Sequence, residues 1–182
     1  GSSTGYRLAG GNILCVNEFV EQARITYKEN YPDTIIMPDD IKQLTGKHFL
    51  ETAGIKEGEL DILDGSPPCS AFSMCGTLGK SGSKHSDGWG KTKKYSTGKT
   101  IENIEDLFFE YIRVAKDIKP KVIIGENVAG LDAGEAKQKK NQIFKAFEEI
   151  GYEVSYKILN SAYYGVPQSR RRLFFVAVRE DV

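Results

Sequence analysis

The chain has 182 residues, of which 40% are hydrophobic and 27% are charged, the composition of one globular domain rather than of a disordered or fibrous chain. Its 25 basic residues balance its 25 acidic ones, so net charge neither favours nor excludes nucleic acid, and no apolar run approaches the roughly 18 residues of a membrane span. Three cysteines are too few for a disulfide scaffold, which indicates a reducing, cytoplasmic compartment.

Apolar patterning predicts strands that alternate with helices along the chain. The predicted strands cover residues 13–16, 34–37, 61–63, 122–124, 154–159 and 173–178. The predicted helices cover residues 18–30, 104–118 and 138–150, and the second of these has a continuous apolar face at helical spacing. Helices between apolar strands are typical of an α/β fold with a mostly parallel, doubly wound sheet.

Residues 76–100 break this alternation, because they are rich in Gly, Ser and Lys and have almost no apolar side chains. A solvated, mobile insertion is the simpler interpretation of a lysine-rich run alone. However, structureless segments of this length inside a compact domain are uncommon and are usually functional. This one also begins directly after the most unusual turn in the chain, so we expect it to be a functional loop.

That turn covers residues 64–73, with the sequence Asp-Gly-Ser-Pro-Pro-Cys-Ser-Ala-Phe-Ser. It leaves the carboxyl end of a predicted strand, where open α/β sheets place their ligands, and Pro67 and Pro68 stiffen it. A lone cysteine is usually a small buried hydrophobe, which suits Cys15 within its strand better than Cys69 on this rigid polar turn. A cysteine–histidine hydrolase or a metal site is disfavoured, because neither of the two histidines follows a predicted strand and no further cluster completes a metal site.

Two polar runs flank later strands. Glu126 and Asn127 follow the strand at 122–124. A carboxylate there could meet a substrate that binds at the carboxyl ends of the strands, although a surface acid in a loop is the simpler interpretation. Residues 168–172 precede the last strand with the sequence Gln-Ser-Arg-Arg-Arg. Strand alternation puts Arg170 and Arg172 on one side and Arg171 on the other. Arginine offers a fixed fork of donors for phosphate or carbonyl oxygens, so both runs are candidate binding residues.

Together and in this order, these motifs resemble those of the DNA cytosine-5 methyltransferases. The matching runs are residues 67–73, 126–128 and 168–172, with weaker matches at residues 17–19, 40–41 and 107–109. The resemblance covers nearly the whole chain. It implies the three-layer Rossmann-like fold of S-adenosylmethionine-dependent methyltransferases, with a mostly parallel sheet, and the methylation of cytosine at C5 in double-stranded DNA by a bacterial restriction–modification or phage enzyme.

The resemblance assigns catalytic roles to four residues. Cys69 is implied to be the nucleophile that adds to C6 of cytosine, because a thiolate is soft and can leave again. Glu126 is implied to hydrogen-bond N3 and the exocyclic amine of the base, which offsets the charge that the attack creates. Arg172, with Arg170, is implied to hold the cytosine O2 and a nearby phosphate, or Glu126 itself.

The same resemblance implies a pocket for S-adenosylmethionine. Glu18 is expected to bind the ribose hydroxyls, Phe19 to pack on the adenine, and Asp40 to accept a hydrogen bond from the adenine amine. The remaining residues expected in this pocket are Ile41, Pro68 and Leu107.

The resemblance also implies contacts with DNA. The target base has to leave the duplex, because C6 cannot be reached within the stack, and residues 76–100 would form a loop that closes on the DNA with lysines near phosphates. Without DNA we expect this loop to be mobile. The residues expected to contact nucleic acid are Ser73, Lys91, Lys93, Lys94, Asn127 and Gln168.

Some family features are not found in the sequence. The first motif, a strand that leads into a glycine-rich turn, is absent, and residues 4–10 resemble the helix that follows it. The target-recognition domain and the final helix that closes the cofactor pocket have no counterpart either. We therefore expect residues 1–182 to be one incomplete catalytic domain without its first strand, inactive in isolation and a poor binder of the cofactor.

Two alternatives are left open. The chain could be a non-catalytic or split-enzyme subunit that needs a partner chain carrying the target-recognition domain, or a relative of the tRNA cytosine-5 methyltransferases, which share the core motifs. A nicotinamide-dependent Rossmann enzyme is disfavoured, because the Gly-x-Gly-x-x-Gly turn is absent.

Overall fold

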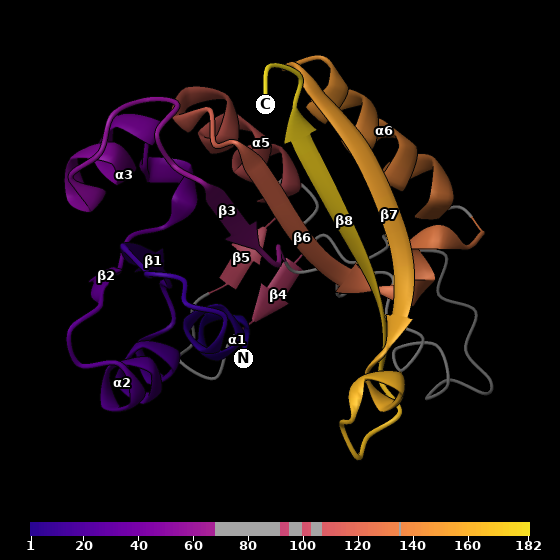
Figure 1. The fold of residues 1–182 in the computed structure, drawn as a ribbon, viewed down its shortest axis with the longest axis horizontal. Helices are drawn as coiled ribbons and strands as arrows, with labels where there is room; N and C mark the ends of the chain where they lie inside the picture. Colours follow the sequence, from indigo (N-terminus) through magenta and orange to yellow (C-terminus); the bar gives the residue numbers. More distant parts are fainter. Residues whose placement is uncertain (68–91, 95–99, 103–106, 135) are drawn as a thin grey trace.

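The structure, a computed structural model, describes residues 1–67, 92–94, 100–102, 107–134 and 136–182, with the backbone alone for 92–94 and 100–102. Figure 1 shows helices packed beside a twisted central sheet, with the N-terminus and the C-terminus at different ends of the molecule. Within the described ranges, no helix is long and apolar enough to cross a membrane.

Two sheets of the described residues form the centre of the fold. In the first, β1 (Cys15–Asn17) pairs in parallel with β2 (Ile35–Met37). The second has the order β3-β6-β8-β7, with bounds Ile62–Gly65 for β3, Val122–Val128 for β6, Arg171–Arg179 for β8 and Tyr152–Asn160 for β7. β8 runs antiparallel to both of its neighbours, so β3, β6 and β7 share one direction. The predicted mostly parallel sheet is confirmed.

The helices are α1 (Ser2–Leu8), α2 (Glu21–Asn30), α3 (Gly46–Ala53), α5 (Leu107–Ile118) and α6 (Ala136–Glu148). Single turns of 3₁₀ helix follow three strands, at η1 (Ile41–Gln43), η4 (Ala129–Asp132) and η5 (Ser161–Tyr164). α5 and α6 lie along one face of the four-stranded sheet (Figure 1).

The main core lies between that face and these two helices. Alternate residues of β6 and β8 are buried against α5 and α6, as expected where strand alternation turns every second side chain towards a covering layer. Gly125 of β6 is required there, because a Cβ at this position would lie 2.0 Å from ring atoms of Phe175 on β8. The opposite face of β6 is half-buried, and it carries Glu126.

Most predicted elements have shifted ends, and three of these shifts change the setting of candidate site residues. β6 continues to Val128 because β8 pairs with it along its whole length, so Glu126 and Asn127 lie within a strand and not in a loop after one. β8 begins at Arg171, so two of the three arginines lie within it. The first predicted helix begins three residues late, at Glu21, because the amide of Glu18 donates a hydrogen bond to the Met37 carbonyl of β2.

One helix and one pair of strands were not predicted from sequence. α3 starts after Thr45 and ends at Gly54, whose φ of 68° is a left-handed helix terminus. β4 (Thr92–Lys94) and β5 (Thr100–Glu102) form an antiparallel pair in which Lys93 lies opposite Ile101. The prediction of a structureless segment over residues 76–100 was therefore wrong at its carboxyl-terminal end. There Lys94 pairs with Thr100, and the other two pairs reach Ile101 and Glu102, just beyond the segment.

Candidate active site

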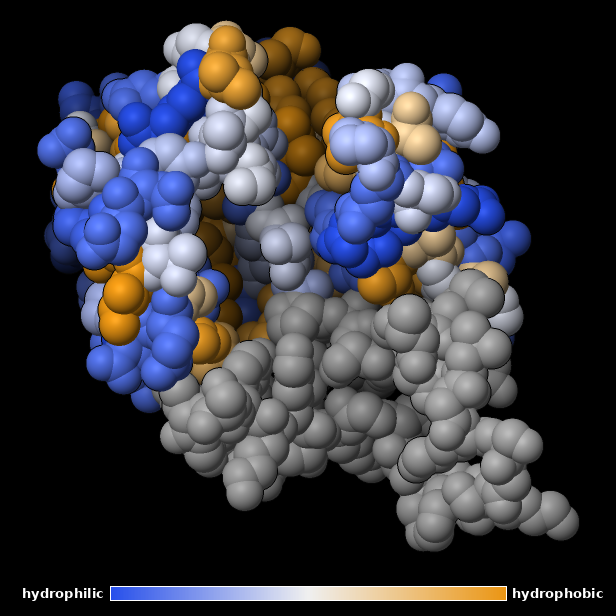
Figure 2. Space-filling view, turned by 90° about the horizontal axis from the view of Figure 1, so that it is seen from below, coloured by the Kyte–Doolittle hydropathy of each residue, from blue (hydrophilic) through white to orange (hydrophobic). Residues whose placement is uncertain are grey.

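A cavity of about 800 Å³ lies where β1, β2 and β3 end, within the range of roughly 300–1,000 Å³ that small-molecule sites occupy. The carboxyl ends of parallel strands are where open α/β sheets bind ligands. Figure 2 shows a hollow between two mostly hydrophilic masses, with hydrophobic surface deep inside. Five of the six residues predicted to bind the cofactor line this one cavity: Glu18, Phe19, Asp40, Ile41 and Leu107.

Two carboxylates lie at the rim of this cavity, one after each of the paired strands β1 and β2. Glu18 accepts a hydrogen bond from the Val20 amide at 2.8 Å, and Asp40 accepts one from the Lys42 amide at 3.1 Å. Each of these contacts uses one carboxylate oxygen, and a carboxylate has about four acceptor positions. Both side chains therefore keep capacity to accept hydrogen bonds from hydroxyl or amine groups of a ligand.

An apolar cluster lies beside these carboxylates. Leu107, the first residue of α5, is 7% exposed and packs against Phe19 and Ile41. Two arginines hold the backbone of this cluster: Arg24 donates to the Phe19 carbonyl at 2.6 Å, and Arg113 donates to the Ile41 carbonyl at 2.8 Å. The sequence-based prediction did not include either arginine, and only the folded chain brings them to these carbonyls.

Tyr6 and Tyr111 were also not predicted. The Tyr6 hydroxyl of α1 donates to Asp64 of β3 at 3.0 Å, and burial, with Asp64 nearby, raises the pKa of Tyr6 well above its usual value. The Tyr111 hydroxyl of α5 donates to the Leu63 carbonyl at 2.9 Å. Burial raises the pKa of Tyr111 as well. Both hydroxyls therefore stay protonated at neutral pH and fix the end of β3, which leads into the cysteine turn.

An ion-pair cluster lies on the half-buried face of the four-stranded sheet. Arg172 Nε lies 2.9 Å from Glu126 Oε1, and Arg170 Nη2 lies 3.9 Å from the same oxygen. The side chains of Glu126 and Arg172 are 30% and 23% exposed, so the pair is open to solvent on one side. Strand alternation brings the three residues together across β6 and β8, as the arginine pattern predicted.

Asn127 has a different environment from that predicted. It is 3% exposed, and its side-chain nitrogen donates to the Pro67 carbonyl at 3.2 Å. Its side-chain oxygen accepts from the Val128 amide at 2.8 Å. Asn127 therefore ties the start of the cysteine turn to the strand that carries Glu126. A contact between Asn127 and nucleic acid stays a prediction.

The loop before β8 is held by Asn160, which sequence reasoning missed. Its side-chain oxygen accepts from the amides of Ala162 and Arg170, at 3.3 and 3.0 Å. Gln168 is exposed in this loop, and its carbonyl accepts from the Ser161 hydroxyl at 2.5 Å. An asparagine at a strand end, directly before a turn of helix, is the local signal that could have identified Asn160.

Several predicted residues lie outside the described parts of the chain: Pro68, Cys69, Ser73 and Lys91. Lys93 and Lys94 are placed by their backbone in β4. The roles predicted for these residues stay predictions.

Comparison with known proteins identifies the family. The C-5 cytosine-specific DNA methylase family model matches residues 1–182. The type II methyltransferase M.FnuDI of Fusobacterium nucleatum is 34% identical over 182 residues, which are all of this chain and 45% of that protein. M.XorII of Xanthomonas oryzae is 30% identical over 184 residues, again all of this chain and 39% of that protein. The chain thus spans less than half of these relatives' length.

Solved structures share the fold. The S. pombe Dnmt2 methyltransferase superimposes with a TM-score of 0.64 at 21% identity, over 98% of this chain and 46% of that one. A DNMT2 variant of Spodoptera frugiperda gives a TM-score of 0.66 at 22% identity, over 97% of this chain and 46% of that one. The predicted Rossmann-like methyltransferase fold is confirmed, and the chain belongs to the C-5 cytosine-specific DNA methylase family.

Proposed function

We propose that the complete protein transfers a methyl group from S-adenosylmethionine to C5 of cytosine in double-stranded DNA. The observation that carries this proposal is the contact between Arg172 and Glu126 on two adjacent strands. The next residue along β6, Asn127, holds the Pro67 carbonyl two positions before Cys69. A carboxylate, a guanidinium and a cysteine turn are thus linked through one short stretch of β6.

The residues around the cavity fit S-adenosylmethionine. Glu18 and Asp40 offer carboxylate oxygens for the ribose hydroxyls and the adenine amine, and Phe19, Ile41 and Leu107 offer an apolar surface for the adenine ring. Every charged residue that lines the cavity is acidic, which suits a cofactor with a sulfonium cation. When bound, this cofactor supplies the methyl group as an electrophile.

The chain's own residues would act on the base. The Cys69 thiolate adds to C6, which makes C5 electron-rich, and it leaves again after methyl transfer when the C5 proton is lost. Glu126 accepts from the exocyclic amine and holds a proton at N3, where negative charge develops. Arg172 donates to O2 of the base and, through its contact with Glu126, holds that carboxylate in position.

The polynucleotide is proposed to be DNA, with the base turned out of the duplex, because the matching family model and the similar relatives are described as DNA methylases or type II methyltransferases. The lysines of residues 76–100 and Gln168 are proposed to contact phosphates, together with Ser73. A segment that recognises the target sequence is proposed to lie outside residues 1–182, in the same protein or in a second chain.

Covalent trapping tests this function in the complete protein. Random-sequence duplex DNA that contains 5-fluorocytosine should form a complex that resists denaturation when S-adenosylmethionine is present, because fluorine at C5 cannot leave as a proton does. Cys69→Ser should abolish the complex, and Glu126→Gln should slow its formation by about a hundredfold or more. The matched control is Cys75→Ser, which should trap normally.

The outcomes separate the alternatives. Trapping that persists in Cys69→Ser, or that is lost equally in Cys75→Ser, would remove Cys69 from the proposed role. Trapping on 5-fluorocytosine RNA and none on DNA would assign the chain to RNA methylation. No trapping on either polymer by a protein that is folded and binds the cofactor would favour a non-catalytic subunit.

A further inference from the structure

The loop between β7 and β8 exposes two adjacent aromatic side chains. Tyr163 is 85% exposed and Tyr164 is 65% exposed, and Val166 beside them is 46% exposed. Single exposed apolar residues are ordinary on a protein surface, whereas contiguous ones often mark an interaction site. We name residues 161–170 the tyrosine loop, and its tip is a candidate contact surface.

Hydrogen bonds fix the shape of the tyrosine loop. At its base the Ser161 amide donates to the Arg170 carbonyl at 3.1 Å, and the Asn160 side chain donates to the Ser169 hydroxyl at 3.2 Å. Gly165 follows the two tyrosines with a φ of 78°, a left-handed conformation that glycine adopts without strain. The rings are thus held on a preformed turn, so binding to them costs less conformational entropy than binding to a flexible segment.

The tyrosine loop lies next to the residues proposed to hold the target base. Figure 1 shows it extending beyond the carboxyl end of β7. Its last residue, Arg170, has a side-chain nitrogen 3.9 Å from Glu126 Oε1, and Arg172 Nε lies 2.9 Å from the same oxygen. A nucleotide strand whose cytosine reaches Glu126 would therefore pass close to the loop.

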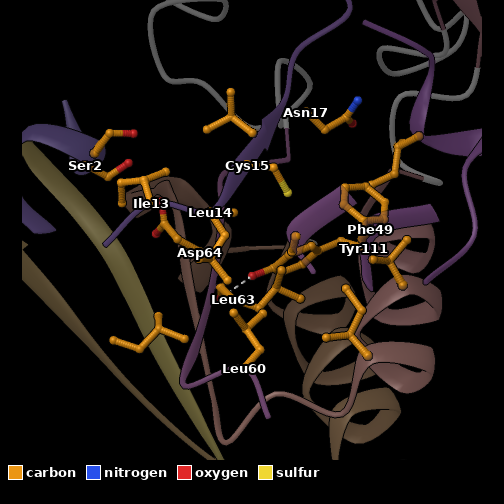
Figure 3. Close-up of a pocket in the computed structure, with 18 of the residues that line it drawn as sticks. Ser2, Ile13, Leu14, Cys15, Asn17, Phe49, Leu60, Leu63, Asp64 and Tyr111 are labelled. Atoms are coloured by element: carbon orange, nitrogen blue, oxygen red, sulfur yellow. Dashed lines mark hydrogen bonds between the residues drawn. The ribbon is translucent and has the colours of Figure 1, made fainter. Parts of the chain in front are cut away.

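The tyrosine loop is separate from the cavity proposed for the cofactor. The side chains labelled in Figure 3 come from α1, α3, α5 and the segments around β1 and β3. None of residues 160–172 is among those that line this cavity. A bound cofactor would therefore leave the two tyrosine rings exposed.

The charge around the loop favours a polyanion. Residues 154–179 contain no Asp or Glu, and Arg170 and Arg171 at the base of the loop are exposed. An acidic protein would also be attracted by these arginines. Two neighbouring aromatic rings beside them favour nucleic acid, because every base has a face on which a ring can stack while a cation contacts the phosphate.

We propose that Tyr163 and Tyr164 form a stacking platform for an unpaired base of DNA, beside the site that holds the target cytosine. This inference rests on the proposed function, because a base loses its partner when the target cytosine leaves the duplex. The rings stack on the exposed base, and the guanidinium of Arg171 contacts the adjoining phosphate. The platform stabilises DNA in which pairing is interrupted, and it contributes little to binding of a fully paired duplex.

DNA binding by the complete protein without cofactor, followed by fluorescence anisotropy, tests the proposal. The probes are two labelled duplexes of the same sequence. In one duplex every base is paired, and in the other an abasic site lies opposite one cytosine. The double variant Tyr163→Leu with Tyr164→Leu should bind the abasic duplex at least about tenfold more weakly than the parent protein does, because it has no ring to stack. Its affinity for the paired duplex should change by less than about twofold, because a paired base offers no free face.

The matched control is the double variant Tyr163→Phe with Tyr164→Phe, which keeps both rings and should bind both duplexes as the parent protein does. A salt series separates stacking from phosphate contacts. The leucine variant should keep the salt dependence of the parent protein, whereas Arg171→Gln should make it shallower by about one phosphate contact. The melting temperatures of both tyrosine variants should match that of the parent protein, because the replaced side chains are exposed.

Two binding results would refute the platform: equal weakening on both duplexes, and unchanged affinity of the leucine variant for the abasic duplex. A lower melting temperature in the leucine variant alone would also refute it, because the rings would then be covered by another part of the protein. Covalent trapping tests the proposed function separately. Trapping by the parent protein with unaltered binding by the leucine variant would reject the platform alone. Selective loss of binding without any trapping would reject methyl transfer and keep the platform.

Discussion

Lys140 is the one charged residue that is buried in the described part of the chain. From its environment we predict how variants of Lys140 and of its partner Asp132 change the free energy of unfolding. Its side chain is 3% exposed, and its Nζ lies 2.6 Å from Asp132 Oδ1. The same Nζ lies 3.8 Å from the centre of the Tyr156 ring. The pair of Lys140 and Asp132 joins α6 to η4, the 3₁₀ turn that follows β6.

The Lys140 side chain is more deeply buried than that of Asp132. This difference determines how much unfolding free energy is lost when either partner is replaced. Asp132→Asn leaves a buried ammonium without its carboxylate, which costs about 3–5 kcal/mol of unfolding free energy. Lys140→Met removes the buried charge and leaves Asp132, whose side chain is 24% exposed and can be hydrated. We expect this second variant to lose only about 1 kcal/mol.

Urea unfolding followed by circular dichroism measures both effects. The double variant Lys140→Met with Asp132→Asn should be more stable than Asp132→Asn alone, because it no longer contains an unpaired buried charge. If Asp132→Asn is less destabilising than Lys140→Met, the assignment of burial to the lysine is refuted.

The effect should also depend on pH. The hydrogen bond from Lys140 holds the pKa of Asp132 below its usual value. A lowered pKa in the folded state stabilises the protein above the unfolded value of about 3.9, and this stabilisation is lost as pH falls through the folded value. The difference in unfolding free energy between the parent chain and Asp132→Asn should therefore shrink below about pH 4.

Three further predictions concern the site and its supports. Gly125→Ala should lower the unfolding free energy by about 2 kcal/mol in urea titrations, because the new methyl would collide with the buried ring of Phe175. Arg172→Lys should lower kcat of the complete protein by at least about tenfold with little change in melting temperature, because a point charge cannot replace a guanidinium that contacts Glu126 and is proposed to contact the base. The Cys15 thiol should react slowly with iodoacetamide at neutral pH and faster as pH rises above about 8.5, because burial raises its pKa and depletes the thiolate.

Matched variants serve as controls for the first two of these predictions. Gly5→Ala should not destabilise α1, because nothing lies within 4 Å of the added methyl. Arg171→Lys should leave kcat nearly unchanged, because strand alternation directs Arg171 away from Glu126. A loss of kcat as large in Arg171→Lys as in Arg172→Lys would contradict the assigned orientation. Cys15 alkylation at the rate of a free thiol at pH 7 would contradict its raised pKa.

Apolar periodicity by itself determined most of the elements. The predicted apolar face of α5, with Phe108, Tyr111, Ile112 and Ala115, is buried in the structure. Each of the six predicted strands is present with shifted ends. Glu18 and Asp40, which follow β1 and β2, line one cavity, since parallel strands bring their carboxyl ends to the same edge, and their binding of the cofactor stays a prediction.

Strand order and strand direction were decided only by the tertiary structure. β8 runs antiparallel between β6 and β7, and this pairing extends β6 far enough to include Glu126. The alternation of Arg170 and Arg172 was readable from the sequence, whereas Glu126 as their common partner was only one of the contacts that the family resemblance implied. A local pattern indicates which face of a strand is apolar, whereas the pairing of β6 with β8 joins residues more than forty positions apart in the sequence.

The environments of polar side chains also depended on the fold. Asn127 was expected to contact nucleic acid, and only the structure shows that its side chain is buried against the Pro67 carbonyl. Lys140 gave no signal of its burial in a helix rich in lysine. Residue type and spacing specify what a side chain can donate or accept. Whether its partner is solvent, a ligand or the chain's own backbone is set by packing, because only packing excludes water and supplies the groups that replace it.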